Sequence, residues 1–308
     1  MSAIKLAIVG MGKIARDQHL PALAANPAFE LVAVASPNHK LQGVPNYPDI
    51  EALLQAVPGV EAVAICTPPQ IRYHIAHRCL RHGCHVLLEK PPGATLSEVR
   101  ALVELAEQRK MTLFATWHSR EASAVEPARQ WLAPRRLRSV KVTWKEDVRV
   151  WHPGQTWIWQ AGGLGVFDPG INALSILTRI IPGTLVLKDA QLSFPANCQT
   201  PIAASLQLAD QLGTDIRVEL DFLQTGPQSW DIEIETDAGR LLMSKGGSVL
   251  EIAGERVVEA RDNEYSNLYA SFEQLVRDRT IDVDVAPLRL VADAFMCGQR
   301  ITVEPFVE

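Results

Sequence analysis

The first residues that could carry out chemistry are Glu89-Lys90-Pro91, which directly follow the apolar run 84–88. That run predicts a buried strand, and Pro91 favours extended backbone at Lys90. Lys90 is therefore expected at the carboxyl end of a strand, where ligands bind in an open parallel sheet. A surface lysine in a turn is the alternative interpretation, because most lysine side chains are exposed.

A second group lies further along the chain, where acidic, amide and imidazole side chains occur among tryptophans. A sugar site needs such a mixture, because flat rings contact its C–H groups and placed polar groups bind its hydroxyls. The rings could instead form core, which we expect for two or three of the five tryptophans. A helix beginning at Pro169 would place Asp168 and Asn172 on one face. The group comprises Trp117, Trp144, Glu146, Trp151, His152, Trp157, Trp159, Asp168 and Asn172.

A glycine loop near the N-terminus favours a ligand-binding role for Lys90 over that of a surface lysine. Gly10-x-Gly12-x-x-Ala15 stands between an apolar run at residues 4–9 and a predicted helix. Gly10 permits a tight turn, Gly12 lets the backbone approach a pyrophosphate, and Ala15 lets the helix pack close to the strand. Lys13 and Ile14 lie in this loop and are expected to contact the dinucleotide. An ordinary glycine-containing turn is the less favoured interpretation.

The second predicted strand, residues 31–35, ends at Ser36, where an NAD enzyme would place Asp or Glu for the ribose hydroxyl. Ser36 is neutral, and His39 and Lys40 bring positive charge nearby, so a 2′-phosphate would meet no repulsion. We therefore expect NADP to be preferred, with NAD also usable, although His39 and Lys40 could simply point to water. The other predicted cofactor contacts follow later strands: Thr67, Pro68, Pro69, Glu89, Lys90, Trp117 and His118.

The elements that position these residues predict an α/β fold with two domains. Residues 1–120 are expected to form a Rossmann domain with a doubly wound parallel sheet. Thr95 and Glu98 form a capping box for a helix from about Leu96 to Arg109. Residues 121–308 alternate with a two-residue period and predict an α+β substrate domain with a large, mostly antiparallel open sheet. The predicted strands of the first domain are 4–9, 31–35, 62–66, 84–88 and 112–116.

Composition limits the classes of function. The chain has 308 residues with 47% hydrophobic and 21% charged, and its net charge of −5 argues against a nucleic-acid partner. No apolar run approaches the ~20 residues of a membrane span. The absence of a signal-peptide pattern and of a CxxC pair favours a cytoplasmic location. We expect no metal, since one group of histidines and cysteines matches no standard zinc spacing: His77, Cys79, His82, Cys84 and His85.

Three motifs resemble the glucose–fructose oxidoreductase/inositol dehydrogenase (Gfo/Idh/MocA) family: Gly10-x-Gly12-x-x-Ala15, Glu89-Lys90-Pro91 and Gly162-Gly163-x-x-x-x-Asp168. Segments 144–147, 151–155 and 167–172 are most similar to its bacterial aldose 1-dehydrogenases for L-arabinose and D-galactose. The resemblance implies oxidation of the C1 hydroxyl of a pyranose to a lactone by hydride transfer to NAD(P). It implies an open sheet that often serves in homo-oligomer contacts. It also implies that Lys90 lies near both nicotinamide and substrate, and that the sugar is bound by Glu146, His152, Asp168 and Asn172. From the aromatic pattern we add Trp151 and Trp159 to the expected substrate-binding residues.

One departure from the family pattern affects the expected mechanism. Many members carry a proton-transferring histidine where this chain has Asn172, and an amide cannot accept a proton at neutral pH. Lys90 could be the base if burial removes its charge. If nearby carboxylates keep Lys90 charged, Asp168 would accept the proton and Lys90 would stabilise the oxyanion. We favour Lys90 as the proton-transfer residue, with Asp168 orienting it or the sugar.

Two other functions remain alternatives at the level of sequence. One is a non-catalytic regulator that binds NADP and sugar, and the other is a polyol dehydrogenase acting on a substrate such as inositol. The presence of both Lys90 and Asp168 favours the enzyme, and Asn172 argues against the polyol dehydrogenase. The sequence leaves open which aldose is the physiological substrate, which anomer reacts, and the oligomeric state.

Overall fold

The structure is a computed structural model that describes residues 2–260 and 263–308. The chain divides into two compact units, the first formed by Met1–His118 with Tyr265–Val285 and the second by Ser119–Glu264 with Ala286–Glu308. The chain first passes from one unit to the other between His118 and Ser119, whereas the predicted boundary lies after residue 120. A single boundary does not anticipate the return of residues 265–285, because the apolar pattern of a helix does not reveal which sheet it covers.

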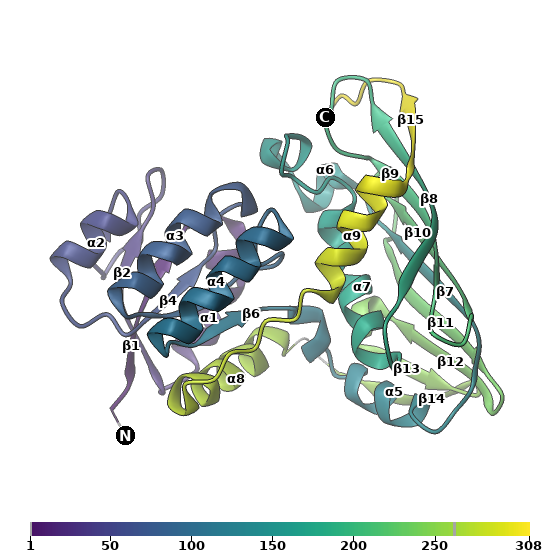
Figure 1. The fold of residues 1–308 in the computed structure, drawn as a ribbon, viewed down its shortest axis with the longest axis horizontal. Coiled ribbons are helices and arrows are strands. Elements are labelled where there is room, and N and C mark those ends of the chain that lie inside the picture. Colours follow the sequence, from purple (N-terminus) through teal and green to yellow (C-terminus); the bar gives the residue numbers. More distant parts are fainter. Residues whose placement is uncertain (1, 261–262) are drawn as a thin grey trace. The chain divides into compact units, whose positions relative to one another are not determined.

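The first unit contains a parallel sheet, as predicted (Figure 1). Its strand order is β3-β2-β1-β4-β5-β6. The order runs outward in both directions from β1, which is the arrangement of a doubly wound sheet. The two-residue β3 was not predicted. The strands are β1 (Ile4–Val9), β2 (Phe29–Ala35), β3 (Asn46–Tyr47), β4 (Ala62–Ile65), β5 (His85–Leu88) and β6 (Leu113–Ala115).

Two apolar clusters cover the two faces of this sheet, because successive strand side chains point to opposite sides. Leu6 and Ile8 belong to the cluster with α1 and α8, whereas Ala7 and Val9 belong to the cluster with α2, α3 and α4. The predicted Thr95–Glu98 capping box is present at α4. The helices are α1 (Leu20–Ala24), preceded by the π-helical turn η1 (Ala15–His19), α2 (Ile50–Ala56), α3 (Pro69–His82), α4 (Leu96–Arg109) and α8 (Glu264–Asp278).

The second unit contains a nine-stranded sheet in the order β14-β13-β12-β11-β7-β10-β9-β8-β15. The pairs β7–β10 and β8–β15 are parallel and the others are antiparallel, which confirms the prediction of a mostly antiparallel sheet. The edge strands β14 and β15 were not predicted. The strands are β7 (Leu137–Lys145), β8 (Val186–Pro195), β9 (Ala203–Ala209), β10 (Asp215–Asp221), β11 (Ser229–Thr236), β12 (Gly239–Ser244), β13 (Val249–Ile252), β14 (Glu255–Glu259) and β15 (Gln299–Val303).

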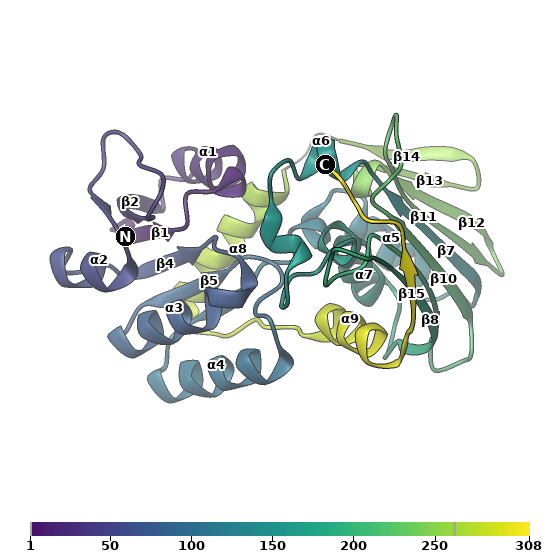
Figure 2. The same cartoon turned by 90° about the horizontal axis from the view of Figure 1, so that it is seen from above.

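Helices cover one face of this sheet and leave the other face open (Figure 2). Along β10, Ile216, Val218 and Leu220 are buried against the helices, while Arg217 is exposed. Helix α7 approaches closely at Gly170, where an added Cβ would lie 2.5 Å from Leu220 Cδ1. In the described residues, no helix is long and apolar enough to cross a membrane. The helices are α5 (Val125–Leu132), α6 (Val148–Trp151), α7 (Phe167–Ile180) and α9 (Ala286–Cys297), with short 3-10 turns η2 (His118–Glu121), η3 (Thr156–Trp159) and η4 (Lys245–Gly247).

Candidate active site

The glycine loop after β1 has the geometry that a dinucleotide needs. Gly10 has a φ of +94°, and a Cβ there would lie 3.0 Å from atoms of Cys66 and Thr67. An added Cβ at Gly12 would meet nothing within 4 Å, so the backbone at Gly12 is open to a ligand. The loop lies where the strand order reverses between β1 and β4, the usual crevice for a dinucleotide. The residues present therefore fit a nicotinamide dinucleotide.

The other predicted cofactor contacts near this loop differ in how exposed they are. Lys13 is exposed and its Nζ lies 2.5 Å from Asp17 Oδ2, and Ile14 is half-buried. Ser36 follows β2, is half-buried, and donates its backbone N–H to the Tyr47 carbonyl at 2.9 Å. His39 is exposed. The basic side chains near the end of β2 are therefore accessible to a ligand.

A buried arginine joins the loops after β4 and β5. Arg72 in α3 is 3% exposed and donates to the backbone carbonyls of Thr67, Glu89 and Pro91. Thr67 precedes Pro68, the N-cap of α3, and Pro69, its first residue, so Arg72 fixes the predicted Thr67–Pro69 loop. The sequence analysis missed Arg72. A charge on the helix face otherwise formed by Ala76, Cys79 and Leu80 is the signal that could have identified it.

Lys90 is the second residue after β5, beyond the carboxyl end of the strand as predicted, and is half-buried. Its backbone N–H donates to Glu89 Oε2 at 3.0 Å. Glu89 is only 3% exposed, and its other oxygen accepts from Tyr265 at 2.7 Å and lies 2.9 Å from His19 Nε2. The Glu89 carboxylate, predicted to contact the cofactor, is thus turned into the protein interior, beneath the backbone of Lys90.

Trp117 and His118, also predicted to contact the cofactor, follow β6. Trp117 is buried and its Nε1–H donates to the Asp284 carbonyl at 2.8 Å. The ring of His118 stacks on that of Tyr265, with centroids 5.5 Å apart. Trp117 therefore has the environment of a core residue, while His118, which is half-buried, is the more accessible of the two.

The second unit brings Glu146, His152 and Asp168 together. Glu146 follows β7, His152 follows α6, whose N-cap is Asp147, and Asp168 lies in the first turn of α7. His152 Nε2 lies 3.0 Å from Glu146 Oε1, and His152 Nδ1 lies 3.6 Å from Asp168 Oδ2. Because an ionised carboxylate only accepts, the Nε2 of His152 carries a proton, and a neutral ring would present its Nδ1 lone pair beside Asp168.

Glu146 is 2% exposed, and both of its oxygens are engaged. The second oxygen, Oε2, accepts from Trp230 Nε1 at 2.8 Å. The sequence analysis missed Trp230, which enters the site because β11 pairs with β7 and places Trp230 opposite Trp144. Only the register of two strands distant in sequence reveals this pair. Glu146 is consequently a fixed acceptor that orients His152.

Aromatic rings surround this cluster. Trp151 is 39% exposed and packs on Trp230 with centroids 4.8 Å apart. Trp159 packs on Phe222 at 5.7 Å and on Phe306 at 5.1 Å. Trp117 and Trp144 are buried, in line with the expectation that two or three of the five tryptophans are core. Exposed rings beside imidazole and carboxylate groups form a surface suited to a sugar.

Asn172 lies one turn beyond Asp168 in α7 and is half-buried. In the described part of the chain, no hydrogen bond joins its side chain to the Glu146–His152–Asp168 cluster; its backbone carbonyl accepts from Ser175 Oγ at 2.7 Å. The Asn172 amide is thus available to a ligand on the same helix face as Asp168. No group of three or more His, Cys, Asp or Glu among the described residues is arranged to hold a metal ion.

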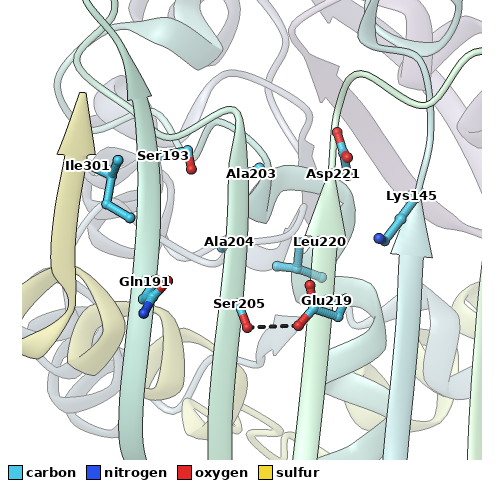
Figure 3. Close-up of a pocket in the computed structure, with 10 residues that line it drawn as sticks. All are labelled: Lys145, Gln191, Ser193, Ala203, Ala204, Ser205, Glu219, Leu220, Asp221 and Ile301. Atoms are coloured by element: carbon cyan, nitrogen blue, oxygen red, sulfur yellow. Dashed lines mark hydrogen bonds between the residues drawn. The ribbon is translucent and has the colours of Figure 1, made fainter. Parts of the chain in front are cut away.

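The open face of the nine-stranded sheet carries a hollow of about 170 Å³ (Figure 3). Ser205 Oγ donates to Glu219 at 2.7 Å across β9 and β10, and Lys145 and Asp221 lie opposite each other in register. The hollow contains none of the predicted site residues, so we do not place the chemistry there. Its lining residues are Lys145, Gln191, Ser193, Ala203, Ala204, Ser205, Glu219, Leu220, Asp221 and Ile301.

Similarity to known proteins extends over both units. Residues 4–116 match the GFO_IDH_MocA oxidoreductase family with an NAD-binding Rossmann fold. The chain is 48% identical over 308 residues to galactose 1-dehydrogenase of Pseudomonas fluorescens, covering 100% of both proteins. It is 54% identical to the crystal structure of the D-galactose-1-dehydrogenase protein from Rhizobium etli, with a TM-score of 0.95 over 100% of this chain and 99% of that one.

A more distant structure shares the fold alone. The crystal structure of a 3-ketoreductase from Actinomadura kijaniata in complex with NADP and TDP-benzene is 20% identical, with a TM-score of 0.86 over 98% of this chain and 99% of that one. This likeness concerns the fold of both units and not the substrate.

Proposed function

The chain belongs to the Gfo/Idh/MocA family of NAD(P)-dependent oxidoreductases, and from this premise we propose that it is an aldose 1-dehydrogenase acting on D-galactose. The C1 hydroxyl of the pyranose is oxidised and the product is the lactone. The observation that carries the proposal is the full-length similarity to two galactose 1-dehydrogenases, which includes the unit that holds the Glu146–His152–Asp168 cluster.

The bound nicotinamide would supply the acceptor for the hydride that leaves C1. The position of Lys90 at the end of β5 supports its role as the residue that takes the proton of the C1 hydroxyl. Asp168 would bind and orient the sugar through its hydroxyls. His152, whose Nε2–H is held by Glu146 at 3.0 Å, would accept a hydrogen bond from a sugar hydroxyl at its Nδ1, which lies beside Asp168.

The exposed ring of Trp151 and the half-buried rings of Trp159 and Trp230 support the binding of a pyranose by stacking. D-galactose and L-arabinose share ring and hydroxyl stereochemistry and differ by a hydroxymethyl group at C5. A pocket discriminates such a difference by only ~1–3 kcal/mol, so we expect L-arabinose to react as well. Asn172, which lacks a proton-accepting group, makes oxidation of inositol the weaker candidate.

We further propose that NADP is preferred over NAD. Ser36 offers no negative charge at the end of β2, and His39 is exposed nearby, so a 2′-phosphate would meet a hydrogen-bonding group and a basic side chain. A cytoplasmic location and a homo-oligomer formed through the open face of the nine-stranded sheet remain predictions from the sequence.

The test is the absorbance at 340 nm of purified protein with D-galactose, L-arabinose and inositol, each with NADP and NAD. Reduction with both aldoses and not with inositol is expected, with a higher kcat/KM for NADP. Tight NADP binding without turnover for any sugar would contradict the enzyme and favour the regulator. The pH–rate profile of Asp168→Asn then separates the two bases, because loss of rate with an unshifted profile excludes Asp168 as the proton acceptor.

A further inference from the structure

A buried hydrogen-bonded group lies beneath Lys90 in the first unit. His19, the last residue of η1, has its Nδ1 2.8 Å from Tyr269 Oη and its Nε2 2.9 Å from Glu89 Oε1. Tyr265 Oη donates to the same Glu89 oxygen at 2.7 Å. Exposure is 0% for His19 and Tyr269, 3% for Glu89 and 5% for Tyr265. Two segments far from Glu89 in sequence, η1 and α8, therefore converge on its carboxylate.

We infer that His19, Tyr265 and Glu89 form a positioning unit that holds the backbone of Lys90 in place. This inference rests on the proposed function, in which Lys90 takes the proton of the sugar. Glu89 Oε2 accepts the Lys90 N–H at 3.0 Å, while its Oε1 is held by His19 and Tyr265. The Glu89 carboxylate thus links His19 and Tyr265 in the protein interior to the backbone of Lys90.

Arg72 supports the same loop from a second direction. It donates to the carbonyls of Glu89 and Pro91, the two residues that flank Lys90. The backbone of Lys90 is therefore fixed at its own N–H and at the carbonyls before and after it. These hydrogen bonds define the position from which the Lys90 side chain extends. A catalytic side chain needs surrounding hydrogen bonds of this kind to hold it in a productive position.

The electrostatics agree with an ion pair between His19 and Glu89. Burial opposes the charge of His19, but Cys66, Tyr269 and the hydrogen bond to Glu89 outweigh it and hold its pKa well above 6.5. Burial likewise opposes the charge of Glu89, but His19, then His118 and Tyr265, lower its pKa to about 2. The guanidinium of Arg72 also lies near the pair, because it donates to the backbone carbonyl of Glu89.

The pair predicts how stability depends on pH. His19 has a raised pKa, so its contribution is complete below pH 6.5 and is lost as the pH rises towards its folded value. Glu89 has a lowered pKa, so its contribution is complete above pH 4.5 and is lost as the pH falls towards about 2. The stabilisation from this pair is therefore greatest between about pH 4.5 and 6.5, and it decreases as the pH rises above or falls below that window.

The experiment compares Glu89→Gln and Tyr265→Phe with the control His85→Gln. His85 is also buried, but it begins β5 at the opposite end from Lys90 and accepts the Thr112 N–H through Nδ1 at 2.9 Å. The readouts are kcat and KM with D-galactose and NADP, the pH–kcat profile, and hydrogen–deuterium exchange of the peptide that contains Lys90. NMR of the His19 ring in the wild type reports its charge directly.

We expect Glu89→Gln to lower kcat about tenfold or more with KM for NADP changed less than threefold, from the loss of a charged hydrogen-bond partner. Its pH–kcat profile should shift and exchange at Lys90 should accelerate. Tyr265→Phe, which removes a single hydroxyl, should show the same changes at smaller size. This variant still tests the inference if Glu89→Gln does not fold. His85→Gln should lose stability without shifting the profile or the exchange at Lys90.

Three results would overturn the inference: a His19 ring that titrates near pH 6.5, Lys90 exchange in both variants equal to that of His85→Gln, or an unshifted pH–kcat profile in both variants. Failure of the proposed function would look different. A wild-type protein that turns over none of the sugars fails as an aldose dehydrogenase, yet His19 titration and Lys90 exchange still test the positioning unit.

Discussion

Replacement of Trp230 by phenylalanine would test how the cluster in the second unit is held. The substitution keeps an aromatic ring beside Trp151 and removes the N–H that donates to Glu146 Oε2 at 2.8 Å. Glu146 is 2% exposed, so water does not readily replace the lost donor. Because Glu146 also orients His152, a shift of its carboxylate would be transmitted to the predicted sugar-binding residues.

The size of the effect follows from the bond that is lost. A hydrogen bond to a buried charged group contributes about 1.5–3 kcal/mol. If the whole loss appears in transition-state binding, kcat/KM with D-galactose falls about 10- to 150-fold, since 1.36 kcal/mol corresponds to a factor of ten. Initial rates at 340 nm over a range of D-galactose at saturating NADP give this value.

Trp144→Phe is the matched control. Trp144 lies opposite Trp230 in the sheet and stacks on it at 6.0 Å, but its buried Nε1 has no hydrogen-bond partner in residues 2–260 and 263–308. The Trp144→Phe variant loses the same ring area without losing a hydrogen bond. Its kcat/KM should therefore change less than about threefold, which is below the range expected from loss of a hydrogen bond to a charged group.

A double-mutant cycle with Glu146→Gln then isolates the bond. If Trp230 acts through Glu146, the combined effect is smaller than the sum of the single effects. The reasoning is refuted if Trp230→Phe lies within threefold of its control, or if the cycle is additive within about 0.5 kcal/mol.

Further substitutions test the fold and the cofactor loop. Gly12→Ala should leave the melting temperature of the free protein unchanged but weaken NADP binding measured by calorimetry, because its Cβ meets nothing in the protein and would face the ligand. Gly10→Ala, at a φ of +94° and 3.0 Å from neighbouring backbone, should instead lower the melting temperature, and an unchanged value would contradict this geometry. Gly170→Ala should cost about 1–3 kcal/mol in urea unfolding, because its Cβ would lie 2.5 Å from Leu220 Cδ1; a neutral result would show that α7 can move away. Arg72→Met should lower the free energy of unfolding by at least about 3 kcal/mol in the same assay, because three backbone carbonyls lose a buried donor. A loss below about 1 kcal/mol would refute the inference that Arg72 holds the loops after β4 and β5.

Sequence patterns were sufficient where the signal is local. The alternation of apolar strands and helices predicted the parallel sheet, and Thr95 with Glu98 predicted the start of α4. The position of Lys90 at the end of β5 followed from an apolar run and one proline. These features depend on neighbouring residues, so a short window of sequence contains the physical cause.

Contacts between distant segments were decided only by tertiary structure. His19 and Tyr265 meet at Glu89 because α8 returns to the first sheet, and nothing in the local pattern of α8 specifies that face. Trp230 reaches Glu146 because β11 pairs with β7 in one register, and a shift of one residue would turn it to the opposite face. The sequence by itself therefore determined the candidate residues on each element and the class of cofactor. The fold decided which of their side chains support the others, because burial and hydrogen bonding between distant segments depend on packing that no short window contains.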